Sequence, residues 1–65
     1  MELSQTTKRL ILFLKAWGLK EDEVVDTVLA LNTDEKAQAL IDWISQNPNA
    51  SKLAIIEKAI MLIDQ

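Results

Sequence analysis

The chain of 65 residues contains no cysteine, no histidine and no tyrosine, and it has one glycine and one proline. Without cysteine it can form no disulfide, and without cysteine or histidine it lacks the strongest protein ligands for transition metals. Small domains commonly depend on such cross-links for stability. This fold therefore has to be stabilised by packing, or by contact with a second polypeptide.

The same absences disfavour catalysis, because histidine, cysteine and tyrosine supply the commonest general base, the strongest nucleophile and the phenolic acid. A single glycine cannot build a phosphate-binding loop. Ser45 and Ser51 flank the proline with no base near them in sequence, so we expect surface and capping roles. The clustered carboxylates lack the alternating spacing of a calcium loop; they are Glu21, Asp22, Glu23 and Asp26. We predict a protein that is not an enzyme and has no metal and no cofactor.

Charge also limits the partners. Seven basic and ten acidic residues give a formal charge of −3, which repels nucleic-acid phosphates and anionic membranes. The alternative is a helix-turn-helix regulator built from residues 21–31 and 34–46, but AQALIDWISQN carries no arginine or lysine for phosphate contacts. No signal segment and no run of about 20 apolar residues is present. We expect a cytoplasmic protein that binds neither nucleic acid nor membrane.

The composition, 49% hydrophobic and 26% charged, is typical of a folded domain. Helix caps divide it into four segments, with Ser4, Thr33 and Ser51 (or Asn49) as candidate N-caps and Gly18 as a terminator. Pro48 ends the third helix and forces Asn47 out of the α region. The sequence predicts an all-α, single helical domain over residues 1–65, a bundle of four short helices at about 4–17, 21–31, 34–46 and 51–63.

Each predicted helix has apolar residues three and four positions apart, which is the spacing of one helix face. The core face of residues 4–17 consists of Leu10, Phe13, Leu14 and Trp17. Residues 21–31 carry a one-sided stripe of Val24, Val25, Val28 and Leu29. In residues 34–46, the side chains expected to face the core are Ala37, Leu40, Ile41 and Ile44. The arc of residues 51–63 is wide, and we expect most of its circumference to be shielded from water. The first and last helices should be central, or should contact something else.

Some large apolar residues fall outside these core faces. Leu12 points away from the stripe of its helix, Ile11 lies at the margin, and Met61 is in a similar position in the last helix. Isolated exposed apolar residues are normal, so one interpretation gives them no role. The other is a partner-binding face or homodimer seam; its candidate residues are Lys8, Ile11, Leu12, Lys15 and Met61.

Basic residues surround Leu12 on an otherwise acidic chain, namely Lys8, Arg9 and Lys15. They would select an acidic protein surface, chiefly through encounter rate and specificity. A second copy would also qualify, since acidic residues are plentiful in the second and third helices, including Asp26, Asp34 and Glu35. We predict a protein–protein interaction or self-association module, whose partner is another protein or a second copy of the chain.

LKAWGLKEDEVVDTVLAL, followed by LIDWIS, resembles the pattern of ubiquitin-associated and related three-helix modules. Leu14, Trp17, Gly18 and Leu19 would occupy their loop motif, and Trp43 and Ile44 the end of their third helix. The chain departs from the pattern with a Trp in place of the usual Met, an insertion before Trp43 and a fourth helix. The resemblance implies a helical architecture, and no ubiquitin-binding residues are carried over. Both tryptophans are expected at the core or its edge.

Overall fold

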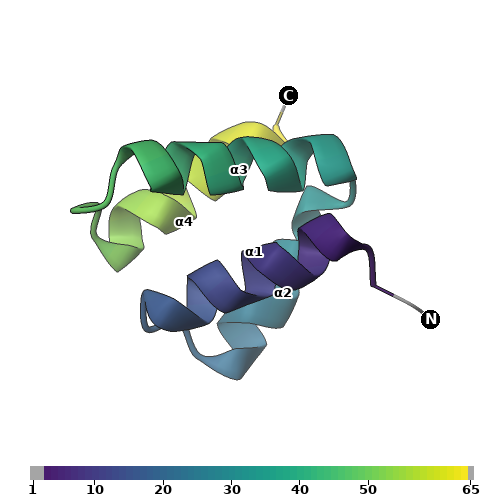
Figure 1. Cartoon of the computed structure of the whole chain (residues 1–65), viewed down its shortest axis with the longest axis horizontal. Coiled ribbons are helices and arrows are strands. Elements are labelled where there is room, and N and C mark those ends of the chain that lie inside the picture. The colour runs from purple at the N-terminus through teal and green to yellow at the C-terminus, as the bar shows by residue number, and fades with distance from the viewer. Residues whose placement is uncertain (1–2, 65) are drawn as a thin grey trace.

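The computed structural model describes residues 3–64 and shows an all-α fold, with no strand in that range. Its four helices are α1 (Gln5–Ala16), α2 (Glu21–Leu31), α3 (Asp34–Gln46) and α4 (Lys52–Ile63) (Figure 1). Each bound lies within one residue of its prediction. Within the same range, no helix is both long enough and apolar enough to cross a membrane.

Side-chain caps explain the helix starts. Ser4, Thr33 and Ser51 each accept a hydrogen bond from the backbone N–H three residues later, over 3.1 to 3.2 Å. Each thereby satisfies one of the amide groups that a helix leaves unpaired at its first turn. Ser51, and not Asn49, is the N-cap of α4.

Left-handed residues explain two of the helix ends. Gly18 follows α1 with a φ of 92°, a conformation that glycine adopts without steric cost. Asn32 ends α2 with a φ of 65°, which asparagine tolerates better than most residues. The third helix ends at Asn47, whose φ of −129° and ψ of 64° lie outside the α region as the following proline requires.

The helices pack as two pairs, with α1 and α2 below α3 and α4 in Figure 1. Within residues 3–64 the backbones of α2 and α3 each come close to those of the three other helices, whereas the backbones of α1 and α4 do not closely approach each other. Of the two alternatives predicted for α1 and α4, a central place or a contact outside the bundle, the first does not hold for the pair together, and the second stays a prediction. The core lies between the pairs, and its largest fully buried side chains are Leu10, Leu14, Leu31, Leu40, Ile44 and Ile55.

Two of the predicted apolar stripes do not face the core as expected. In α2, Val24 is buried but Val25 and Leu29 are exposed, because this helix meets the core along the edge that carries Val24 and Leu31. In α4, the predicted shielding of most of the circumference is also wrong. Its buried residues are Ile55, Ala59 and Leu62, and its exposed large apolar residues are Leu53, Ile60 and Met61. The stripes of α1 and α3 pack as predicted.

Candidate functional site

Exposed apolar side chains are the main unexplained feature of this surface. Large hydrophobic residues with more than two fifths of their surface exposed occur before α1 and in α1, α2 and α4; within residues 3–64 they are Leu3, Leu12, Val25, Leu29, Leu53, Ile60 and Met61. Scattered exposed apolar residues need no explanation, but contiguous patches commonly mark interaction sites. The question is which of these residues lie together.

Several of them line a shallow groove between α1 and α2, with a volume of about 230 Å³. The segment before α1 contributes Leu3, α1 contributes Ile11, and α2 contributes Val25, Val28 and Leu29. We call these residues the α1–α2 face. Leu3, Val28 and Leu29 also line the adjoining hollow, which continues to the start of α3. The face is therefore a continuous apolar surface, and it spans two helices.

Helix geometry explains why α2 presents this surface. At 100° per residue, Leu31 lies about 20° from Val24 around the helix axis, whereas Leu29 lies about 140° away. Val24 and Leu31 are buried together, so packing them in the core turns Val25 and Leu29 outward. This was a signal in the sequence: with Leu31 included, the stripe is wider than one buried face needs.

Charged residues border the α1–α2 face on both sides. On α1, Lys8 and Lys15 lie next to Ile11 around the helix, on the side away from α2, and we call them the basic rim. On α2, Asp22 and Asp26 follow Leu29, and we call them the acidic rim. All four side chains are exposed. None of the four forms an ion pair with any residue in the described part of the chain.

The structure brings together most, but not all, of the residues predicted for partner binding. Ile11 is half-buried and, with Lys15, lines the groove. Leu12 is 69% exposed. Around α1, the basic rim lies between Ile11 and Leu12, so Leu12 is outside the α1–α2 face. Met61 is 60% exposed, but it does not line the groove, and the backbone of its helix does not closely approach that of α1. Val25 and Leu29 were missed, because their stripe was assigned to the core.

A second, smaller apolar surface lies on α4. Leu53 and Ile60 are exposed and seven residues apart, with the half-buried Ile56 beside them. We call these three residues the α4 face. Glu57 and Asp64 project from the same side of the helix and are exposed. Its apolar residues are therefore bordered by negative charge on one side, and the lysine on the other side, Lys52, already pairs with Glu23.

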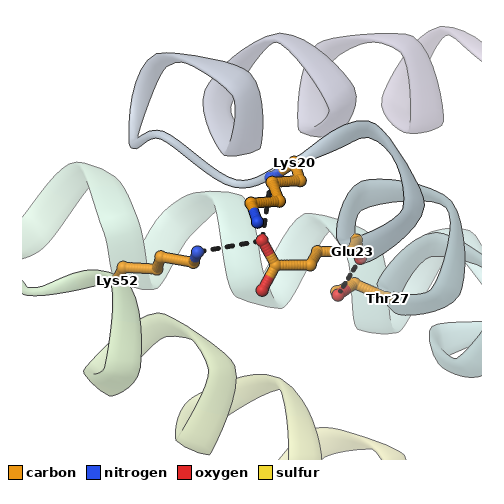
Figure 2. Close-up of polar contacts among 4 residues, drawn as sticks. All are labelled: Lys20, Glu23, Thr27 and Lys52. Carbon is orange, nitrogen blue, oxygen red and sulfur yellow. Dashed lines mark hydrogen bonds and ion pairs between the residues drawn. The ribbon is translucent and has the colours of Figure 1, made fainter.

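A polar cluster joins the start of α2 to α4, as Figure 2 shows. One carboxylate oxygen of Glu23, Oε1, accepts a hydrogen bond from the backbone N–H of Lys20 over 2.9 Å and pairs with Lys52 Nζ, also at 2.9 Å. The hydroxyl of Thr27 donates to the Glu23 carbonyl over 2.8 Å. The pKa of Glu23 is lowered, chiefly by the Lys20 N–H and then by Lys52.

This cluster connects helices and does not resemble a catalytic site, since a lowered pKa keeps Glu23 ionised and unsuited to general acid–base work near neutral pH. No group of three or more side chains within residues 3–64 is arranged to hold a metal ion.

Both tryptophans lie half-buried at the edge of the core, as predicted. The indole N–H of Trp17 donates to the Ala50 carbonyl over 2.8 Å and so connects the end of α1 to the loop before α4. Trp43 lines an open hollow of about 440 Å³ with that loop, whose other lining residues are uncharged. The hydrogen bond accounts for the position of Trp17, and the lining of the hollow beside Trp43 carries none of the basic residues that a base-stacking groove requires.

The chain matches no protein-family model, and it shows no significant similarity to curated proteins or to solved structures.

Proposed function

We propose that this chain is a non-catalytic helical module that binds another polypeptide through the α1–α2 face. The observation that carries the proposal is the exposure of Val25 and Leu29 on the same surface as Ile11 and Leu3. A chain this short buries a limited share of its apolar surface. Covering the face with a partner would remove side chains from water that each contribute roughly 1.5–3 kcal/mol when fully buried.

Protein binding is favoured over the nucleic-acid alternative by the charges of α3, which would be the recognition helix. Its exposed charged residues are Asp34, Glu35 and Asp42. Its lysine, Lys36, is half-buried and donates a hydrogen bond to the carbonyl of Ile63. A helix with this surface would repel the phosphates of a DNA groove.

The proposal is tested by affinity capture from the native extract, with the wild-type chain, Leu29→Lys and Leu53→Lys as baits. The two leucines make a matched pair, since each is 65% exposed and each substitution adds one positive charge. We expect Leu29→Lys to lose the bound polypeptides and Leu53→Lys to retain them. A second copy of the chain, if captured, counts as a bound polypeptide. Identical recovery with all three baits would contradict the proposal.

A further inference from the structure

We propose that the α1–α2 face binds a second copy of this chain, with the two copies related by a twofold axis that runs along the groove between α1 and α2. This inference rests on the proposed function, because it names the partner of the same surface. It is carried by the order in which charged and apolar side chains follow one another across the face.

Across the face, from α1 to α2, the order is basic rim, apolar residues, acidic rim. Lys8 and Lys15 lie on the outer side of Ile11, and Asp22 and Asp26 lie beyond Leu29 on the side of α2 away from α1. The groove lining supports this order, because Lys15 and Ile11 lie on its α1 side and Val25 and Leu29 on its α2 side. The lining also includes the acidic Glu21, at the end of the groove where α2 begins. The two sides of one continuous apolar surface therefore carry opposite charges.

A twofold axis along the groove lays α1 of one copy over α2 of the other. The basic rim of each copy then meets the acidic rim of its partner, and the contact occurs twice because a twofold interface repeats every contact. A twofold axis across the groove would instead lay α1 over α1 and place lysine against lysine. Charge complementarity therefore favours one orientation and suppresses the other.

The course of the helices indicates the pairing. Lys15 lines the groove with Glu21, and Thr7 lines the adjoining hollow with Asn32, so α1 and α2 run antiparallel. Lys15 is thus level with the start of α2, and Lys8 lies nearer its second half. In the dimer, Lys15 of one copy meets Asp22 of the other, and Lys8 meets Asp26.

Neither a uniformly acidic partner nor the α4 face fits the charges as well. An acidic surface would satisfy Lys8 and Lys15 but would meet Asp22 and Asp26 with like charge. In two copies of the α4 face, Glu57 and Asp64 would meet either like charge or Lys52, and Lys52 already pairs with Glu23 of its own chain. The α1–α2 face is the described surface on which apolar area and charges of both signs are self-complementary.

The size of the molecule is compatible with such a dimer. Stable interfaces bury about 800 Å² on each partner, which is less than a fifth of the 4412 Å² that this chain exposes. The rim charges lie at the edge of the apolar residues, as in most protein interfaces.

Sedimentation equilibrium over about 1 μM to 1 mM, which brackets modest protein affinities, tests the proposal. The average mass of the wild type should rise reversibly from 7.3 kDa toward twice that value. Leu53→Lys should behave as the wild type, and Leu29→Lys should remain at the monomer mass. A wild type that stays monomeric throughout overturns the proposal, as does a Leu29→Lys chain that dimerises like the wild type.

A charge exchange tests the orientation. Neither Lys8 nor Asp26 is a cap residue, so Lys8→Glu and Asp26→Lys leave the side-chain caps intact. Each variant alone should dimerise about tenfold more weakly, because like charges then meet across the axis. An equimolar mixture should recover wild-type affinity, since each copy meets its opposite charge at both rims. Mixed chains that associate no better than the separate variants overturn this orientation. Circular dichroism confirms that each variant is folded.

These results separate the two proposals. If the wild type is monomeric while capture from the extract still depends on Leu29, the dimer is overturned and the proposed function stands with a different partner. If neither self-association nor capture depends on Leu29, both fail.

Discussion

Glu23 shows how much of this fold depends on single polar residues. Its carboxylate caps the first turn of α2 through the Lys20 N–H and pairs with Lys52 in α4. Carboxylates are stabilising at helix N-termini because the backbone N–H groups there are unpaired and partly positive. Both interactions are stronger with the ionised form, which explains the lowered pKa of Glu23.

The stability contributed by Glu23 should therefore depend on pH. A group whose folded pKa is lowered contributes stability above its ordinary pKa, here 4.5, and this stability is lost as the pH falls through the lower, folded pKa. We expect Glu23→Gln to melt below the wild type at neutral pH, with the difference shrinking as the pH falls below 4.5 and through the lower, folded pKa. Thermal melts across this range provide the measurement. A difference that persists unchanged in acid would contradict the assignment.

Gly18 and Asn32 form a second residue-scale pair, since both have a positive φ. A Cβ at Gly18 would meet no atom within 4 Å, so Gly18→Ala should destabilise through backbone strain alone, by about 1 kcal/mol. Asn32→Gly should be close to neutral, because glycine adopts the same φ without strain. Denaturant unfolding of both variants measures the effect. A neutral Gly18→Ala would show that α1 does not need its left-handed terminator.

At the scale of elements, capping residues made the bounds of the helices predictable. They did not indicate which side of each helix faces the core. Ser4, Thr33 and Ser51 are local signals, since each cap bonds to an amide three residues away. The burial of α2 is not local: whether Val24 or Val25 faces the core depends on how α2 crosses α1, α3 and α4. Spacing alone could not assign the exposed half of that stripe.

The connection between α1 and the loop before α4 gives a prediction at this scale. Trp17→Phe keeps an aromatic ring but leaves the Ala50 carbonyl without its 2.8 Å donor. We expect a loss of about 1 kcal/mol in the free energy of unfolding beyond any packing change. Trp43→Phe is the control, because the Trp43 indole N–H has no protein partner within residues 3–64. Equal losses in the two variants would show that the hydrogen bond contributes nothing.

At the scale of the molecule, two apolar surfaces remain outside a small core. Leu12 was predicted to be exposed from its place opposite the core stripe, and the structure shows this. The grouping of the site was less predictable. Met61 does not line the groove, because within the described range the backbones of α1 and α4 do not closely approach each other, and interhelical angles decide that. The partner-binding role of Lys8, Ile11, Leu12, Lys15 and Met61 stays a prediction.

If the chain dimerises through the α1–α2 face, its thermal stability should depend on concentration. Association of folded chains stabilises them by mass action, so the melting temperature of the wild type should rise with concentration. The melting temperature of Leu29→Lys should not change, whereas that of Leu53→Lys should rise as in the wild type. Calorimetry at several concentrations measures this. A concentration-independent melting temperature in the wild type would contradict it.

The central claim is that the α1–α2 face is where this chain makes contact with its partner, a second copy. The backbone amide shifts of the isotopically labelled wild type, followed by nuclear magnetic resonance through a dilution series, test it most directly. The account predicts that signals of Ile11, Val25 and Leu29 move with concentration while those of Leu53 and Ile60 stay fixed. Shifts that cluster on α4, or no shifts at all, would contradict it.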